Sequence, residues 1–319
     1  MREERDAARR ERANDRRTKP IERSPMKLWI LSDLHLEAVP HPDAFDPPRP
    51  DFDVLVCAGD VWEGRTDLAF PFLRQLAGDR PVVFVMGNHE HWNGEIEENL
   101  AEARLWAEAN DVTLLEGEEA TIEGTRPDNT PFGPVRFVGC TLWSDYRLAG
   151  AGADPRAETG EAVMVRHEDD HGGGEHWLTV ADAIALHERS RARLAELIEA
   201  HGTEMDGTEA QDDPAVPLVV VTHHAPHPDC LPIERRGTWA SGNGASDLSA
   251  LTDRGTVALW VHGHLHGRTD LRRLAPEDGA NRSDAADPVA PTGTRIVQNA
   301  AGPRFHNATF DEGLVIEVS

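Results

Sequence analysis

The chain has 319 residues, of which 57 are acidic and 32 are basic, and its formal net charge is −25. A field of this sign repels polyanions, which argues against a dedicated nucleic-acid-binding groove. The sequence contains no apolar run of about 18 residues, and its N-terminus is charged, so it predicts neither a transmembrane helix nor a secretory signal.

The first segment, residues 1–25, contains nine basic and six acidic side chains and almost no apolar ones. Such a segment buries too little apolar surface to fold, so we expect a disordered, charged N-terminal extension. Met26 then opens the run Met-Lys-Leu-Trp-Ile-Leu, which is typical of a first buried strand. We therefore expect the functional domain to begin at Met26 and to span 26–319.

From Met26 onward, strand-like and helix-like segments alternate as they do in α/β proteins. The continuous apolar runs among them are typical of strands that are covered on both faces. Strands are expected near 27–32, 53–58, 81–86, 112–115, 120–123, 135–140, 217–222, 257–262, 269–274, 294–299 and 313–318. Helices are expected near 66–77, 95–109, 179–201 and 246–253.

Three polar stretches, near 148–178, 203–215 and 275–293, look inserted into this pattern, and we expect them to form surface loops. The first contains His167, His171 and His176. A lid or an additional metal-binding patch is the alternative to a solvated loop there.

The three cysteines, Cys57, Cys140 and Cys230, are few and odd in number. Two of them lie inside or at the end of apolar strand-like runs. This favours buried thiols in a reducing compartment over disulfides, and a cytoplasmic location is the expectation.

Five short polar segments end strand-like runs, and together they predict a metal centre. They read Ser-Asp-Leu-His at 32–35, Gly-Asp at 59–60, Gly-Asn-His-Glu at 87–90, Thr-His-His-Ala-Pro at 222–226 and Gly-His-Leu-His at 263–266. In open α/β sheets, ligands gather beyond the carboxyl ends of strands, where all five segments are expected. A single strand-end carboxylate is more often a helix cap than a ligand, so the prediction rests on the joint pattern.

The local spacing suggests how the first segments would hold an ion. Asp33 and His35 are two residues apart, and an extended chain sends alternate side chains to the same side. Small residues before Asp60 leave room for a metal, and Asn88 adds a ligand without adding charge. Mixed nitrogen and oxygen ligands fit Mn, Fe, Zn or Co better than an all-oxygen Mg or Ca site.

Spacing alone does not distinguish between neighbouring histidines. His262, His264 and His266 share one strand parity, and His223 and His224 are adjacent.

As a set, the five segments resemble the calcineurin-like metallophosphoesterase superfamily, over essentially 26–319. The resemblance implies a four-layer α/β/β/α sandwich of two mixed sheets flanked by helices. It also implies a binuclear centre of divalent or trivalent transition-metal ions, and the sequence does not specify their identity. The implied metal ligands are Asp33, His35, Asp60, Asn88, His223, His264 and His266, with Asp60 bridging the two ions.

The family pattern also decides between the neighbouring histidines. Its Gly-His-x-His block falls on His264 and His266, which leaves His262 as a strand residue or a residue that supports the ligands. Its histidine before the proline-bearing turn falls on His223, which leaves His224 to contact substrate or to orient a ligand.

The implied activity is hydrolysis of a phosphomonoester or a phosphodiester. Two ions roughly 3.5–4 Å apart polarise the phosphoryl oxygens and generate a bridging hydroxide that attacks phosphorus in line. His89 would be the general acid or a transition-state stabiliser, with a structural histidine as the alternative. A nucleotide or another small phosphorylated metabolite is the favoured substrate.

The rival hypothesis is a catalytically silent scaffold of the same fold that binds partner proteins. The presence of His89 and of every implied ligand favours the enzyme. Residues that could select the substrate include Glu90, His91, Trp92, Asn93, Arg147 and His187, for which surface or packing roles are the alternative. The oligomeric state is not specified by the sequence.

Overall fold

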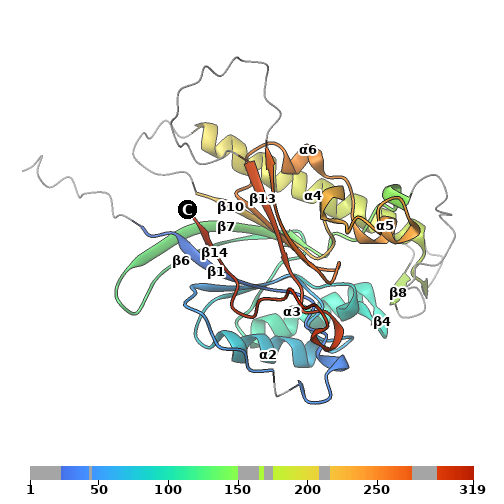
Figure 1. The fold of residues 1–319 in the computed structure, drawn as a ribbon, viewed down its shortest axis with the longest axis horizontal. Coiled ribbons are helices and arrows are strands. Elements are labelled where there is room, and N and C mark those ends of the chain that lie inside the picture. Colours follow the sequence, from blue (N-terminus) through green and yellow to red (C-terminus); the bar gives the residue numbers. More distant parts are fainter. Residues whose placement is uncertain (1–22, 43–44, 150–164, 169–174, 208–215, 275–292) are drawn as a thin grey trace, which may run out of the picture.

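The computed structural model describes residues 23–42, 45–149, 165–168, 175–207, 216–274 and 293–319. Figure 1 shows two β-sheets stacked between helices, with α2 (Thr66–Ala77) and α3 (Ile96–Ala109) below them and α4 (Val180–Gly207) above. Most of the expected N-terminal extension, and the larger part of each expected inserted loop, lies outside the described residues.

The first sheet has the strand order β14–β1–β2–β3–β5. The strands β1, β2, β3 and β5 run parallel to one another, and β14 is antiparallel to β1 at the edge. Their bounds are β1 Met26–Leu31, β2 Val54–Cys57, β3 Val82–Phe84, β5 Thr113–Leu114 and β14 Val315–Val318.

The second sheet has the order β12–β13–β11–β10–β7–β6. Its central strands are parallel, whereas β6 and β12 are antiparallel to their neighbours at the two edges. Its strands are β6 Glu118–Thr125, β7 Pro131–Cys140, β10 Leu218–Thr222, β11 Leu259–His262, β12 Arg268–Leu274 and β13 Gly293–Asn299.

Alternation of side chains along the strands produces the layers. In β1, Leu28 and Ile30 face the second sheet, while Trp29 faces α2 and packs in one cluster with Phe70. On the far side, Leu194 of α4 packs in the cluster that covers the second sheet, together with residues next to the short helices α5 (Trp239–Gly244) and α6 (Ser249–Thr252). These layers confirm the predicted four-layer α/β/β/α sandwich.

The predicted helix at 66–77 matches α2, and the expected strands all appear, with ends shifted by a few residues. The sequence did not predict α5 or the 3₁₀ turns. These turns are η1 Leu36–Ala38, η3 His89–His91, η4 Arg147–Ala149, η5 Pro228–Cys230 and η6 Pro303–Phe305.

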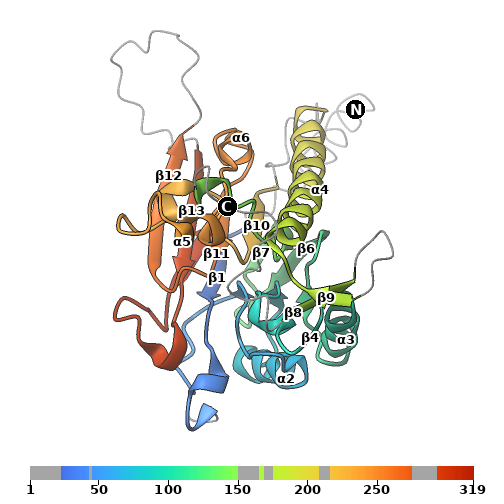
Figure 2. The same cartoon turned by 90° about the vertical axis from the view of Figure 1, so that its right-hand side faces the viewer.

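A third, small sheet lies where a loop was expected within 148–178. It joins β4 (Gly94–Glu95), β8 (Val165–Glu168) and β9 (Glu175–Trp177), and Figure 2 shows it beside α3. Val165 and Leu178 are buried against Ile96 of α3, so apolar packing rather than solvation governs this part of the segment. Helix α4 likewise extends through residue 207, into the expected loop at 203–215.

The described part of the chain begins before Met26. Ser24 pairs with Phe132 of β7, and the carbonyl of Pro25 accepts a hydrogen bond from Arg126 at 2.7 Å. The last residues of the expected extension therefore contact the second sheet.

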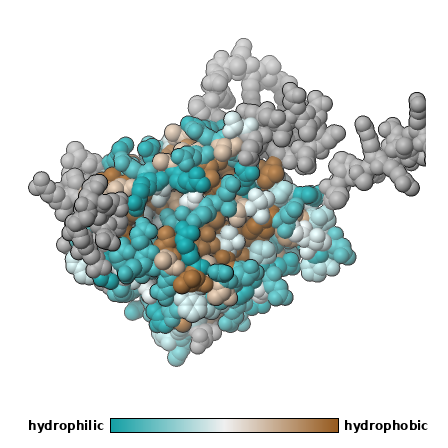
Figure 3. Space-filling view, turned by 180° about the vertical axis from the view of Figure 1, so that it is seen from behind, coloured by the Kyte–Doolittle hydropathy of each residue, from teal (hydrophilic) through white to brown (hydrophobic). Residues whose placement is uncertain are grey.

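Cys57, Cys140 and Cys230 are buried free thiols, as predicted. Seen from behind, the described surface is mostly hydrophilic, with apolar residues gathered in a band across the middle of that face (Figure 3). Within the described ranges, no helix combines the length and the apolar composition that a membrane span requires.

Candidate metal centre

Five parallel strands from the two sheets deliver the predicted site residues to one edge of the sandwich. Asp33, Asp60 and Asn88 follow β1, β2 and β3 of the first sheet, and His223 and His264 follow β10 and β11 of the second. The site therefore forms beyond the carboxyl ends of strands, as the sequence predicts.

Left-handed turns, not extended chain, aim several of these side chains. The backbone φ angle is 53° at Asp33, 46° at His35, 56° at Asp60, 68° at His264 and 52° at His266. The expectation that Asp33 and His35 project from extended backbone is therefore wrong. Non-glycine residues in this conformation are strained, and such strain gathers at functional sites, where surrounding contacts hold it.

Backbone hydrogen bonds between neighbouring loops hold these turns. The amide of Asp33 donates to the carbonyl of Gly59 at 2.9 Å, and the amide of His35 donates to that of Asp60 at 3.0 Å. The β1 and β2 loops are thus fastened to each other.

Asp33, His35, Asp60 and His266 form the first cluster, in which one ligand atom from each residue lies within 4.8 Å of the others. The Nε2 atoms of His35 and His266 are 3.0 Å apart. His35 Nε2 lies 3.7 Å from Asp60 Oδ2, and His266 Nε2 lies 3.6 Å from Asp33 Oδ1.

Asp60, Asn88, His223 and His264 form the second cluster. His223 Nε2 lies 3.2 Å from Asp60 Oδ2 and 2.8 Å from Asn88 Oδ1. The Nδ1 atom of His264 approaches the same Asn88 oxygen at 3.0 Å. Asp60 thus belongs to both clusters and stands in the position expected of a bridging ligand.

The donor atoms fit transition-metal ions. Asp33 Oδ2 and Asp60 Oδ2 are buried and have no hydrogen-bond partner among the described residues. Buried carboxylate oxygens without partners are costly, so oxygens that converge with ring nitrogens point to cations as the missing partners. The mixture of carboxylate, amide and imidazole donors suits Mn, Fe, Zn or Co.

The electrostatics of the clusters favour positive charge. Burial lowers the pKa of His223, but the carboxylate of Asp60 outweighs this effect and raises the pKa to about 10. Burial also lowers the pKa of His35. The hydrogen bond between His35 and Glu37, together with the charge of Asp60, outweighs burial and raises the pKa of His35 to about 9. Burial raises the pKa of Asp60, yet His223 and His89 hold this pKa well below its ordinary value.

Glycines leave the space in which the two clusters meet. A Cβ atom on Gly87 would overlap the Oδ1 atom of Asp60, and it would lie 2.7 Å from the His223 ring. A Cβ atom on Gly263 would lie 2.7 Å from Asp33 Oδ2. The glycines of the sequence motifs are therefore required by close approach.

His89 lies beside the first cluster and is partly exposed. Its ring centroid is 4.6 Å from that of His35 in an edge-on contact, and its ring stacks on that of Trp92 at 3.9 Å. Its Nδ1 atom is 3.9 Å from an oxygen of Glu63. His89 therefore contacts the centre without belonging to the two clusters described above.

Glu90 lies beneath the centre, whereas the sequence suggested that it could rim a pocket. It is 1% exposed, and its carboxylate accepts four backbone N–H hydrogen bonds. Those from Gly87 and Asp60, at 2.7 and 2.9 Å, join the β3 loop to the β2 loop. Its position after Asn88 and His89 in the motif was the only sequence signal for this role.

Two histidines next to the implied ligands stand outside the clusters. His224 stacks on the His264 ring at 4.2 Å, and its Nδ1 atom lies 3.2 Å from the Thr141 carbonyl. His262 is fully buried at the end of β11, and its Nδ1 atom lies 3.0 Å from the Gly263 carbonyl. The parity argument fails because β11 ends at His262 and the following residues turn.

The remaining candidates lie apart from the two clusters. Arg147 is exposed near Asp145 and Glu188, and His187 is buried with its Nδ1 atom 3.2 Å from the Leu142 carbonyl. Of the histidines in the expected inserted loop, His176 approaches Asp182 at 2.8 Å. Only the backbone of His167 is described, and His171 lies outside the described residues.

The chain matches several solved structures. A phosphopantetheinyl hydrolase from Mycobacterium tuberculosis is 21% identical with a TM-score of 0.60, and the match covers 92% of this chain and 96% of that chain. A purple acid phosphatase from yellow lupin (Lupinus luteus) seeds is 12% identical with a TM-score of 0.42, over 88% of this chain and 44% of that chain.

None of the curated proteins compared with the chain matches it. A family model described as calcineurin-like phosphoesterase matches residues 26–268, a range that includes both clusters, His89 and most of the sandwich. The chain therefore belongs to the calcineurin-like phosphoesterase family.

Proposed function

We propose that the protein is a binuclear metal-dependent phosphoesterase that hydrolyses a small phosphorylated metabolite or nucleotide, as a monoester or a diester. The observation that carries the proposal is the pair of ligand clusters that share Asp60 and contain buried carboxylate oxygens with no hydrogen-bond partner among the described residues. When bound, two ions would supply Lewis-acid stabilisation of the phosphoryl oxygens and a nucleophilic water.

In this proposal, Asp33, His35, Asp60 and His266 hold one ion, and Asp60, Asn88, His223 and His264 hold the other. The neutral amide of Asn88 keeps the negative charge of the site low enough to admit an anionic phosphoester.

His89 acts on the leaving group in this proposal. Its side chain is 19% exposed and lies beside the first cluster. Burial lowers the pKa of His89, although the charge of Asp60 opposes this effect. An imidazole in this position can donate a hydrogen bond, or a proton, to the departing oxygen.

Turnover of p-nitrophenyl phosphate and bis-p-nitrophenyl phosphate, with Mn²⁺ and after chelation, tests the activity. We expect hydrolysis of at least one ester that chelation abolishes and Mn²⁺ restores. Absence of metal-dependent turnover on both esters and on a nucleotide panel would favour the rival hypothesis of a silent scaffold. The panel should include a phosphopantetheine ester, because a protein of similar fold is named for that group.

The His89→Ala variant separates catalysis from metal binding. We expect turnover to fall about 10²-fold or more while the metal content stays near two ions per chain. The matched control is His41→Ala, which removes an exposed histidine from another part of the chain. Unchanged turnover in His89→Ala would remove this residue from its proposed role.

The buried free thiols are consistent with a reducing compartment, and we propose the cytoplasm.

A further inference from the structure

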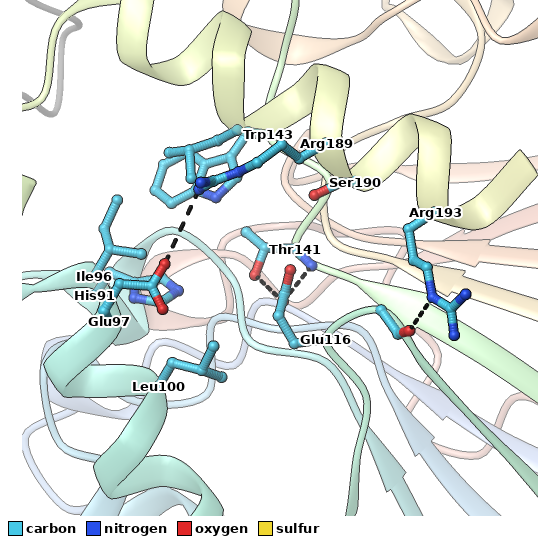
Figure 4. Close-up of a pocket in the computed structure, with 12 residues that line it drawn as sticks. His91, Ile96, Glu97, Leu100, Glu116, Thr141, Trp143, Arg189, Ser190 and Arg193 are labelled. Carbon is cyan, nitrogen blue, oxygen red and sulfur yellow. Dashed lines mark hydrogen bonds and ion pairs between the residues drawn. The ribbon is translucent and has the colours of Figure 1, made fainter. Parts of the chain in front are cut away.

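A cavity of about 240 Å³ lies between α3 and α4, outside the two metal clusters (Figure 4). Ile96 and Leu100 of α3 and Leu186 of α4 form apolar walls, together with Trp143. Glu116 and the segment after β7 complete the lining. The cavity is partly open to solvent.

An aromatic wall separates this cavity from the metal centre. The Trp143 ring lies 5.6 Å from the ring of His91, which also lines the cavity, and 5.8 Å from that of His224. His224 in turn stacks on the proposed ligand His264. The cavity is thus a neighbour of the centre and not a part of it.

Two polar groups face this cavity with unused hydrogen-bonding capacity. His91 is 3% exposed, and its Nδ1 atom has no hydrogen-bond partner among the described residues. Glu116 accepts two hydrogen bonds from Thr141, at 2.8 and 2.9 Å, and both end on Oε2. No hydrogen bond to Oε1 of Glu116 is present among the described residues, so this oxygen can accept one from an occupant.

We propose that this cavity binds a purine ring, as a free base or as a nucleoside. The ring would lie against Trp143 and place its polar edge at Glu116 and His91. An apolar cavity of about 150 Å³ admits benzene, so roughly 240 Å³ suits a bicyclic ring. Aromatic stacking favours a flat ring of this kind.

The polar groups match the edge of a purine. A carboxyl group accepts hydrogen bonds from ring or exocyclic N–H groups, and a histidine nitrogen donates or accepts according to its tautomer. Burial raises the pKa of Glu116 to about 7, so near neutral pH the group occurs both as an acceptor and as a donor. The ionised carboxylate can accept a hydrogen bond from an N–H group of the purine edge. The protonated carboxyl group can donate one to a ring nitrogen or a carbonyl oxygen of that edge.

An exposed ion pair closes one side of the cavity. Arg189 of α4 lies 4.0 Å from Glu97 of α3, and Figure 4 shows this contact spanning the two helices. Exposed pairs of this kind contribute little stability, so it can open to admit a ligand.

Binding of adenosine and guanosine to the full-length protein tests the proposal, with uridine as the pyrimidine control and titration calorimetry as the measurement. These nucleosides contain no phosphoester, so the result does not depend on the proposed hydrolytic function. We expect saturable binding of at least one purine nucleoside, about tenfold or more tighter than that of uridine, with metal present or chelated.

Glu116→Gln should weaken purine binding about tenfold or more, because it removes an ionisable partner of the polar edge. The matched control is Glu119→Gln, which alters a half-exposed glutamate of β6 outside the cavity and should leave binding unchanged. Leu100→Trp, which fills the cavity, provides a second variant if Glu116→Gln does not fold. Circular dichroism checks folding.

Three results would overturn the proposal. They are no saturable binding of either purine, equal binding of uridine, and wild-type purine affinity in a folded Glu116→Gln or Leu100→Trp protein.

Discussion

At the scale of single residues, carboxylates that are not proposed ligands hold the ligands in place. Glu90 fastens the β2 and β3 loops through four backbone N–H groups, and Glu37 Oε1 lies 3.0 Å from His35 Nδ1. A hydrogen bond to the second ring nitrogen fixes the tautomer and orientation of a ligating histidine. The geometry of the centre therefore depends on residues that an inventory of ligands omits.

Glu90→Gln should destabilise the protein and lower its metal occupancy. An amide NH₂ would face backbone N–H donors in place of an acceptor oxygen, and leaving a buried donor unpaired costs about 1–3 kcal/mol. We expect the free energy of unfolding to fall by about 3 kcal/mol, as measured by urea denaturation.

The matched control for Glu90→Gln is Glu108→Gln, which changes an exposed residue of α3 and should lie within about 0.5 kcal/mol of the wild type. Equal stability of the two variants would show that Glu90 does not organise the centre.

Metal binding should release protons. The pKa values of His35 and His223 are raised to about 9 and about 10, so both rings are protonated at pH 7, whereas only the neutral imidazole binds a metal. Affinity for Mn²⁺ should therefore increase as pH rises toward 9, by up to about tenfold per pH unit for each proton released.

Calorimetric titration in buffers of different ionisation enthalpy measures this proton release. An observed enthalpy that does not change with the buffer, together with an affinity that does not change between pH 6 and pH 9, would contradict the prediction.

At the scale of elements, the sequence predicted the strands and the longer helices because their apolar patterns are continuous and their ends carry polar motifs. It did not predict β8 and β9, since β8 packs against α3, which is distant in sequence, and β9 pairs with β8. The sequence predicted that Asp33 and His35 point at the same ion, but it assigned them an extended backbone conformation instead of left-handed turns. Left-handed turns at such residues are stabilised by hydrogen bonds between loops, which no local pattern records.

Gly87→Ala tests whether the loop after β3 needs a residue without a side chain. The added methyl group would overlap the Asp60 carboxylate and the His223 ring. We expect loss of most Mn²⁺ binding, as measured by metal analysis after dialysis, while circular dichroism stays unchanged. Gly202→Ala is the control, because its Cβ would lie 3.6 Å from Thr256, an ordinary contact. Wild-type metal content in Gly87→Ala would contradict this account of the glycine.

At the scale of the whole molecule, excess negative charge is the dominant long-range feature. The 32 basic side chains can pair with at most 32 of the 57 acidic ones, so 25 negative charges stay unmatched. The ion pairs of the described residues are mostly exposed, and each contributes little. Salt screens both the attraction within these pairs and the repulsion among the unmatched charges. The repulsion is the larger of the two, so its screening has the greater effect on stability.

Added salt should consequently stabilise the protein. We expect Tm to rise by about 5 °C between about 20 mM and about 500 mM NaCl at pH 7, because screening removes roughly 1–3 kcal/mol of repulsion. KCl should act in the same way, which separates screening from ion-specific binding. Near pH 5 the net charge approaches zero, since the sequence pI is about 4.9, and the rise should shrink there. A Tm that falls with salt at pH 7 would mean that attractive pairs, and not repulsion, dominate the surface of this acidic chain.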